Sequence, residues 1–323
     1  MAARLLEVDN LKTYFIEGKS VAKAVDGVSF YVGENETLGL VGESGSGKTM
    51  TCLSILRLVP RPGRIVGGRV LFEGEDLLTI SEKQMQKLRG GKISMILQDP
   101  MTSLNPVFTI GNQVGESIAT HLKLKGSALT ARIVEMLRQV RIPSPETRIS
   151  AYPHQMSGGM KQRVVGAISI SCQPRLLIAD EPTTSLDVTI QAQYLELLGD
   201  IQRELGMSLI FITHDFGIVA NTCDRVAVMY AGQIVESAPV MDIFHKPAHH
   251  YTAALLKAVP KLDTRVDRLT SIPGQPPRLG YFPSGCRFHP RCAASDEKCV
   301  REEPPLVAVD ENHSVKCWHQ VNG

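Results

Sequence analysis

The chain has 323 residues, of which 35 are Lys or Arg and 33 are Asp or Glu, so its formal net charge is +2. Hydrophobic residues make up 43 % of the chain, which is enough for a full core and excludes a disordered protein. The balanced charge argues against a protein that mainly coats nucleic acid, so we expect no nucleic-acid partner. No apolar run reaches the roughly 18 residues of a membrane span and no signal peptide is visible, so we expect a cytosolic protein.

The order of the apolar segments predicts an α/β protein. Residues 5–41 are partly alternating and broken by turns, as in an antiparallel edge sheet. Short apolar runs, several of them separated by helical stretches, lie at 37–41, 93–97, 176–179, 209–213 and 226–230. This alternation predicts a buried, mostly parallel core sheet covered by helices.

A helical insertion and a late change in composition define the expected domains. Between about residues 99 and 172 the chain is mainly helical. Its apolar residues recur along one helix face at Ile133, Val134, Leu137 and Val140. After residue 260 the chain becomes loop-rich and proline-rich. We therefore expect one domain over residues 1–260, with a helical subdomain at about 99–172, and a C-terminal extension over 261–323.

A glycine-rich turn follows the run 37–41 and precedes a helical stretch. It matches the pattern G-x-x-x-x-G-K-[ST], which surrounds phosphate oxygens with backbone N–H groups and a helix N-terminus. Lys48 is placed to reach the β- and γ-phosphates of a nucleotide, and the Thr49 hydroxyl to bind Mg²⁺. The residues expected to bind the nucleotide here are Gly42, Glu43, Ser44, Gly45, Ser46, Gly47, Lys48, Thr49 and Met50.

Two acidic residues follow the apolar run 176–179. An acid at the carboxyl end of a strand beside a phosphate loop can hold Mg²⁺, and Asp180 suits that role. Glu181, one residue further on, is suited to polarise a water for attack on the γ-phosphate. An acidic turn capped by Pro182 is the alternative interpretation, which the preceding phosphate-loop pattern disfavours.

The segment 156–163 reads MSGGMKQR and resembles the LSGGQ signature of the ATP-binding subunits of ABC transporters. Met156 replaces Leu and Met160 replaces Gln, and both departures leave the Ser-Gly-Gly core intact. The resemblance implies that Ser157, Gly158 and Gly159 contact an ATP held by a second subunit. Taken alone, the segment is also explained as a helix start with Ser157 as its N-cap.

Shorter motifs agree with this resemblance in their order and spacing. Gln98 resembles the Q-loop glutamine, which senses Mg²⁺ and the attacking water. His214 resembles the switch histidine that contacts the γ-phosphate. Ser185 and Asp187 resemble the D-loop, which communicates across the dimer. Gln98, His214 and Glu181 are therefore the expected catalytic residues.

The resemblance also implies an aromatic side chain stacked on adenine and a set of Mg²⁺ ligands. Phe15 resembles the A-loop aromatic residue, and its neighbour Tyr14 is the other candidate. The expected Mg²⁺ ligands are Thr49, Gln98 and Asp180.

The chain has one copy of each motif. In the family, the phosphate loop of one subunit and the signature of another enclose each ATP. The resemblance thus implies a second ABC ATPase subunit, either a sister chain or a second copy, and two transmembrane permease subunits at the cytoplasmic face of the membrane. A soluble ABC ATPase acting on DNA or ribosomes is the alternative. Such relatives tend to carry two nucleotide modules or a long coiled coil, and neither is visible in this sequence.

Residues 271–292 resemble the C-terminal extension of oligopeptide and dipeptide importer ATPases. The segments YPHQ at 152–155 and DPMTSLNP at 99–106 are similar to the same subfamily. The resemblance implies peptide import, with selection by an extracytoplasmic binding protein and the permeases. Import of nickel or glutathione is the alternative.

Four of the seven cysteines fall after residue 285, with five, six and 17 residues between them. A reducing cytosol favours a metal or cluster site over disulfides. Because tight C-x₂₋₄-C pairs are absent from the sequence, we expect a 4Fe–4S cluster, which some peptide-importer ATPases with a similar arrangement carry, with zinc or free thiols as alternatives. The expected cluster ligands are Cys286, Cys292, Cys299 and Cys317. The nearby His289, His313 and His319 are expected to be solvated loop residues.

Overall fold

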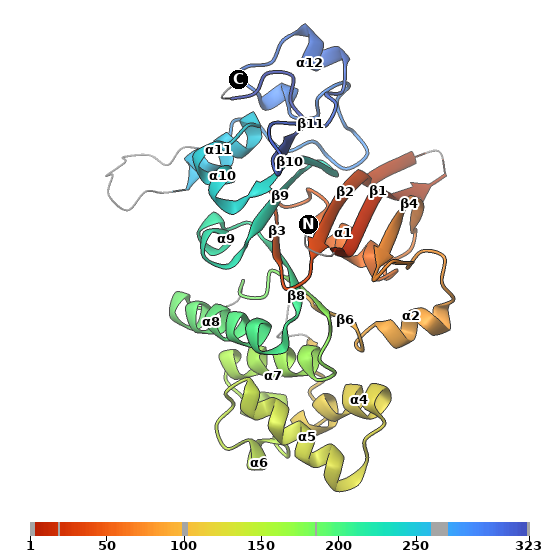
Figure 1. The fold of residues 1–323 in the computed structure, drawn as a ribbon, viewed down its shortest axis with the longest axis vertical. Helices are drawn as coiled ribbons and strands as arrows, with labels where there is room; N and C mark the ends of the chain where they lie inside the picture. The colour runs from red at the N-terminus through yellow and green to blue at the C-terminus, as the bar shows by residue number, and fades with distance from the viewer. Residues whose placement is uncertain (1–3, 19, 99–102, 185, 260–270, 322–323) are drawn as a thin grey trace. The chain divides into compact units, whose positions relative to one another are not determined.

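The computed structural model describes residues 4–18, 20–98, 103–184, 186–259 and 271–321 (Figure 1). Asp99, Pro100, Ser185 and the expected domain boundary near residue 260 lie outside these residues. The chain divides into two compact units. The first unit contains residues 32–36 and 79–211, and the second contains residues 6–31, 37–78 and 212 onward.

An antiparallel sheet in the second unit confirms the interpretation of the N-terminal residues. Its strand order is β2-β1-β4-β5, and both β1 with β4 and β4 with β5 pair antiparallel. The strands are β1 (Arg4–Glu17), β2 (Ser20–Gly33), β4 (Gly63–Phe72) and β5 (Glu75–Asp76). Alternate residues of β1, such as Leu6 and Val8, are buried, as expected of a sheet with one face on the core.

The second unit also holds a mixed sheet of buried strands. Strand β3 (Thr37–Val41) pairs parallel with β9 (Arg225–Tyr230), and both are buried along their whole length. Strand β10 (Gln233–Pro239) pairs antiparallel with β9 and with β12 (Ser314–Val315), which pairs with β11 (Val307–Ala308). The late part of the chain thus adds two short strands to this sheet.

Short helices complete the second unit. The α-helices are α1 (Lys48–Ile55), α9 (Phe216–Thr222), α10 (Val240–His245), α11 (His250–Ala258) and α12 (Glu297–Arg301), and η2 (His289–Arg291) is a 3₁₀ turn. At the starts of α9, α11 and α12, the side chains of Asp215, His249 and Asp296 accept hydrogen bonds from backbone N–H groups.

The first unit holds parallel strands of its own. Strand β6 (Ile93–Ile96) pairs parallel with β7 (Leu176–Asp180), and β8 (Ser208–Thr213) lies next to β7. The parallel core predicted from the apolar runs is therefore confirmed. Strand β6 ends one residue before the expected end, at Ile96, and Leu97 is exposed.

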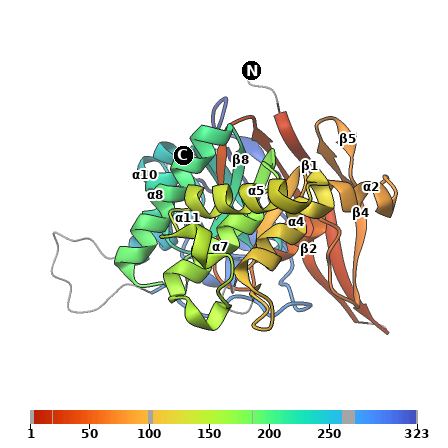
Figure 2. The ribbon, with the colours of Figure 1, turned by 90° about the horizontal axis from the view of Figure 1, so that it is seen from below.

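Helices make up the rest of the first unit. They are α2 (Glu82–Leu88), α4 (Ile110–Leu122), α5 (Gly126–Gln139), α6 (Pro145–Arg148), η1 (Pro153–Gln155), α7 (Gly158–Ile170) and α8 (Val188–Leu205). Helices α4, α5 and α7 pack side by side (Figure 2). The expected core face of α5 buries Ile133 and Leu137, whereas Val134 is half-buried and Met136 is buried instead.

A buried ion pair fastens the C-terminal segment to β10. The Glu236 carboxylate accepts hydrogen bonds from the Ala248 and His249 backbone N–H groups and lies 2.8 Å from His313 Nε2. Glu236 and His313 are 0 % and 2 % exposed, so the expectation of a solvated His313 is wrong. The hydrogen bond to Glu236, against the opposing effect of burial and with help from the Asp310 and Asp242 charges, raises the pKa of His313.

Because this pKa is raised in the folded state, the charge of His313 stabilises the fold below its unfolded pKa near 6.5 and ceases to do so as pH rises through the folded pKa. We expect His313→Gln, which keeps a donor but not the charge, to lower the free energy of unfolding by about 1–3 kcal/mol at pH 6 and by less at pH 9. Urea unfolding at both pH values measures this difference. His245→Gln, at an exposed position on α10, is the control, and an equal loss at both pH values would contradict the assignment.

Candidate functional site

The turn between β3 and α1 packs so closely on neighbouring backbone that two of its positions leave no room for a side chain. A Cβ on Gly42 would lie 2.1 Å from the Met229 carbonyl oxygen, and one on Gly47 would lie 2.5 Å from the Ala24 carbonyl oxygen. Gly47 also has a φ of 105°, in the left-handed region that glycine favours. Both positions therefore require glycine, because the turn approaches the backbone of these strands closely.

Lys48 begins α1 and folds back over the turn. Its ammonium group donates to the carbonyl oxygens of Gly42 at 2.7 Å and Glu43 at 3.1 Å, and to Ser46 Oγ at 3.4 Å. The side chain is buried, with 6 % exposed, at the N-terminus of a helix whose partial positive charge favours anions. This positive charge at a helix start has the chemistry of a phosphate site.

Glu43, the second residue of the turn, is held by residues of the late chain. Its backbone N–H donates to the Tyr251 hydroxyl at 2.8 Å. Its carboxylate receives two hydrogen bonds from Arg291, at 2.6 and 3.0 Å. A bidentate guanidinium–carboxylate pair fixes orientation as well as charge, so the side chain of Glu43 has a single direction.

The two aromatic candidates of β1 have different surroundings. Tyr14 donates its hydroxyl to Asp26 Oδ1 at 2.6 Å, and Asp26 also pairs with Arg287. Burial and then the Asp26 hydrogen bond raise the pKa of Tyr14 to about 12, so it remains a phenol. Phe15, the next residue of the strand, lies opposite Gly63 in β4 and is half-buried.

The acidic residues at the end of β7 lie in the first unit. Asp180 ends the strand and is 1 % exposed. Glu181 follows with a φ of 45°, which is unusual for a residue with a Cβ and is typical of functional turns. Its carboxylate accepts from Gln98 Nε2 at 3.3 Å and from the Thr184 hydroxyl at 3.1 Å. The structure thus brings together the expected base, Glu181, and Gln98.

The signature residues line a pocket of about 440 Å³ in the first unit. Ser157 is the N-cap of α7, with Met160 N donating to its hydroxyl at 3.4 Å. Asp187 is the N-cap of α8, with Ile190 N donating to its carboxylate at 3.0 Å. The pocket is lined by Arg141, Pro143, Ser157, Gly158, Gly159, Met160, Arg163, Leu186, Asp187 and Ile190. The N-cap interpretation of Ser157 is therefore confirmed, and the same residue lines this pocket, whereas its contact with ATP stays a prediction.

The signature helix is tied to the turn that carries Glu181. Gln162, on α7, is 1 % exposed and donates its side-chain amide to the Pro182 carbonyl oxygen. His214, in the second unit, follows β8 and precedes α9, and it is exposed.

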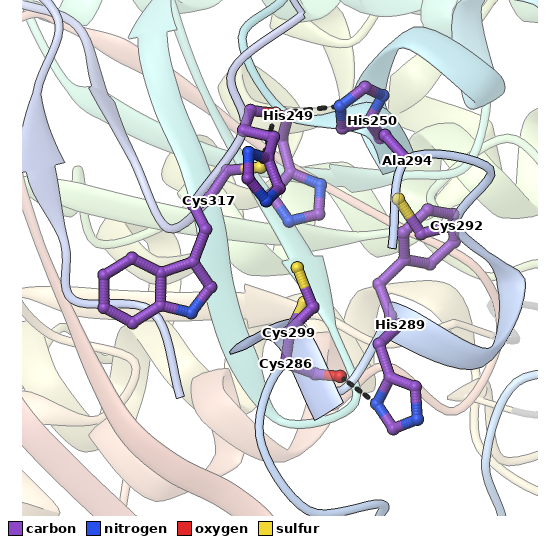
Figure 3. A pocket seen from close by; sticks show the side chains of 11 residues that line it. His249, His250, Cys286, His289, Cys292, Ala294, Cys299 and Cys317 are labelled. Atoms are coloured by element: carbon purple, nitrogen blue, oxygen red, sulfur yellow. Dashed lines mark hydrogen bonds between the residues drawn. The ribbon is translucent and has the colours of Figure 1, made fainter. Parts of the chain in front are cut away.

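The four late cysteines line one small pocket in the second unit (Figure 3). Burial raises the pKa of Cys317 to about 11 and also raises the pKa values of the other three thiols. Removal of these protons therefore requires a compensating positive charge, such as that of a metal. The other residues around the pocket are His249, His250, Phe288, His289, Ala294, Trp318 and His319.

A second set of donors overlaps this pocket. The ligand atoms of Asp296, Cys299 and His319 lie within 4.8 Å of one another, which suits a single metal ion. Hydrogen bonds from the Cys299 backbone and from His319 lower the pKa of Asp296 to about 2, so it is a carboxylate. His319 is about half-exposed and is bonded to Asp296, and His289 bonds to the Cys286 carbonyl oxygen. His319 is an exposed loop residue, as expected, whereas His289 is only half-buried and lies in the 3₁₀ turn η2.

Comparisons with known proteins assign the two parts of the sequence. Residues 25–184 match the family described as "ABC transporter", and residues 235–299 match "Oligopeptide/dipeptide transporter, C-terminal region". The "Probable peptide ABC transporter ATP-binding protein y4tR" of Sinorhizobium fredii is 50% identical over 97% of this chain and 94% of its own length. The chain belongs to the ABC transporter family, as an ATP-binding protein.

Further comparisons agree with this assignment. The "Oligopeptide transport ATP-binding protein OppD" of Bacillus subtilis is 50% identical to this ABC protein over 98% of this chain and 88% of its own length. The ATP-binding cassette MJ0796, solved as a dimer bound to ADP and Pi, shares the fold with a TM-score of 0.65 and 23% identity, over 73% of this chain and 98% of its own. As a member of this family, the chain is an ATPase with the α/β fold of an ABC cassette. Within the part of the chain that the structure describes, every helix is too short or too polar to cross a bilayer.

Sequence reasoning missed the residues of this ABC ATPase that hold the turn from the late chain. Arg291, Arg287 and Tyr251 had no assigned role. Arginines are common in loop segments, and the carboxylate partners of these two lie about 250 residues earlier, so the local sequence offered no signal.

We expect Gly47→Ala to destabilise the fold more than Gly45→Ala. Both positions have positive φ, but a Cβ at Gly45 meets open space, whereas one at Gly47 meets the Ala24 carbonyl oxygen. The expected loss is about 1 kcal/mol for Gly45→Ala and at least about 2 kcal/mol more for Gly47→Ala. Urea unfolding without nucleotide measures both, and equal losses would show that the turn yields to a side chain.

Proposed function

We propose that this chain is the ATP-hydrolysing subunit that energises peptide import by an ABC transporter at the cytoplasmic face of the cell membrane. The support is that the family match over residues 235–299 and both full-length relatives name peptide or oligopeptide transport. We propose that two transmembrane permeases and an extracytoplasmic binding protein select the peptide. Nickel or glutathione as cargo is the alternative.

Two features of the structure support ATP hydrolysis by a pair of subunits. The second unit presents a phosphate loop with a buried Lys48, and the first unit presents a pocket that joins the signature residues to Asp187. We propose that the phosphate loop of one subunit and the signature pocket of another enclose each ATP. The dimeric state of the neighbour MJ0796 supports this arrangement. Ser185 is proposed as the other D-loop residue.

Each proposed catalytic residue contributes to transfer of the γ-phosphoryl group to water. Lys48 and the N-terminus of α1 neutralise the charge that spreads over the phosphate oxygens. The Glu181 carboxylate takes the proton of the attacking water, and Gln98, already bonded to Glu181, orients that water. His214 contacts the γ-phosphate, and Phe15 stacks on the adenine, with the neighbouring Tyr14 as the other candidate.

The residues proposed for Mg²⁺ fit a hard dication. A carboxylate that is 1 % exposed, as Asp180 is, is costly unless a positive charge compensates it. Thr49 and Gln98 supply the hydroxyl and amide oxygens that Mg²⁺ accepts. The ion, when bound, would neutralise phosphate charge.

Residues 1–260 form the proposed nucleotide-binding domain, with a helical subdomain at about 99–172, and 261–323 form the extension.

The test of this function is peptide uptake by the complex reconstituted in vesicles with its two permeases and binding protein. We expect Glu181→Gln to retain ATP binding, to hydrolyse ATP about 10²–10⁴-fold more slowly, and to abolish uptake, because the water loses its base. Glu196→Gln, at an exposed position on α8, is the control with the same change in charge. Wild-type turnover in Glu181→Gln would refute the assigned base, and ATP-driven uptake of nickel or glutathione but of no peptide would refute the cargo.

We propose a 4Fe–4S cluster held by Cys286, Cys292, Cys299 and Cys317. The support is that all four side chains line one pocket. The cluster, when bound, would crosslink four positions of a segment that has little apolar core of its own. Zinc, on a donor set that includes Asp296, Cys299 and His319, is the alternative.

Metal analysis of anaerobically purified protein separates these two possibilities. We expect a brown protein with about four irons per chain, with iron lost in Cys286→Ser and retained in the double variant Asp296→Asn/His319→Gln. Asn keeps the cap of α12, so the double variant removes donors without removing the helix start. A colourless protein with one zinc that the double variant loses would refute the cluster.

A further inference from the structure

Two arginines between Cys286 and Cys292 reach out of the cysteine segment into the nucleotide site. The side chains of Arg287 and Arg291 are 8 % and 4 % exposed, so both charges are almost entirely withdrawn from water. Buried charges of this kind require complete pairing, and their geometry is accordingly fixed. The carboxylate partners of both lie early in the chain.

Arg291 uses all three of its nitrogen atoms. Nε donates to the Pro273 carbonyl oxygen at 2.9 Å, Nη1 donates to Glu43 and to the Tyr230 hydroxyl, and Nη2 donates to Glu43. The guanidinium also lies 5.8 Å from the ring centroids of Tyr230 and Phe288. The guanidinium group that binds the Glu43 carboxylate is thus itself fixed by contacts with the C-terminal extension.

Glu43 transmits this constraint to Lys48. Its carboxylate is fixed by Arg291, its backbone N–H by Tyr251, and its carbonyl oxygen accepts from the Lys48 ammonium group at 3.1 Å. One residue therefore joins the arginine of the extension to the lysine of the phosphate loop. A phosphate loop that is already ordered does not lose that conformational freedom when nucleotide binds.

Arg287 makes a parallel connection on the adenine side. It pairs with Asp26, which accepts from the Tyr14 hydroxyl, and it donates to the Ala231 carbonyl oxygen. Both ends of the short segment from Cys286 to Cys292 are thus connected to residues beside the nucleotide.

We propose that Arg291 is a positioning residue for ATP, and that the four-cysteine site is coupled to ATP affinity through its pairing with Glu43. This rests on the proposed function, since it requires that the phosphate loop binds ATP. A change that displaces Cys292 moves the neighbouring Arg291, releases the Glu43 carboxylate and loosens the loop. Because such coupling is reciprocal, bound ATP in turn stabilises the cysteine segment.

Equilibrium binding of a fluorescent ATP analogue to the full chain tests the role of Arg291. We expect Arg291→Ala to raise Kd by about tenfold, the equivalent of one charge-assisted hydrogen bond, with KM raised in parallel and kcat at saturating ATP changed by less than about twofold. Arg291→Lys keeps the positive charge but loses the bidentate geometry of the guanidinium group, so its Kd should lie between those of the wild type and Arg291→Ala. Arg301→Ala, at an exposed position on α12, is the matched control. Equal Kd values in Arg291→Ala and wild type would overturn the proposal, whereas a wild type that binds no ATP would overturn the proposed function instead.

A variant cycle and hydrogen exchange keep the test independent of global folding. Glu43→Gln, a change of similar shape, should raise Kd as Arg291→Ala does, and the double variant should be no weaker than either single variant. Exchange of the backbone amides at 43–47 should be several-fold faster in Arg291→Ala without nucleotide, with α4 and α5 unchanged. Additive losses, or unchanged exchange in the loop, would overturn the positioning role.

The coupling to the cysteines has its own measurement. Cys292→Ser should raise the Kd for the analogue in the wild-type background and leave it unchanged in the Arg291→Ala background, because the arginine is the connection. The same loss in both backgrounds would show that the cysteine site affects nucleotide binding by another route and would overturn the coupling.

Discussion

The close packing of the turn between β3 and α1 is the constraint on which the nucleotide site depends. Gly42 and Gly47 let the turn lie directly on the backbone of Met229 and Ala24, so the loop has a shape before any ligand arrives. The Lys48 ammonium group donates hydrogen bonds to carbonyl oxygens of the same loop. A loop without these contacts would be less ordered, so each residue that supports the turn helps to preserve its shape.

Buried ion pairs, rather than a second apolar core, fasten the late chain to the rest of its unit. Arg291 with Glu43, Arg287 with Asp26, and His313 with Glu236 each join the extension to an earlier element. Such pairs add little to the net stability of the fold, because the cost of desolvating the two charges opposes their attraction. They nevertheless fix the geometry of the segments that they join, because an unpaired buried charge is costly. The extension is therefore held in one register by few contacts.

The sequence was sufficient for the parts that depend on local pattern. Continuous apolar runs predicted the buried strands β3, β7 and β9, and the phosphate-loop pattern predicted the start of α1. It was insufficient for pairs such as Arg291 with Glu43, which are 248 residues apart, because periodicity reports only neighbours along the chain. The burial of His313 was not predicted for the same reason, since it depends on a carboxylate 77 residues earlier. Ser185 lies outside the residues that the structure describes.

The hydrogen bond from Gln162 to the Pro182 carbonyl oxygen has a mechanical consequence. Helix α7 begins at the signature, and Pro182 is the residue after Glu181, so the buried Gln162 amide in the second turn of the helix connects them. Because a helix is stiff along its axis, a push on its first turn displaces the chain at Pro182 as well. In a dimer of the proposed kind, a subunit that presses on the signature of its neighbour would thereby also shift the Glu181 carboxylate, the proposed base, of that neighbour.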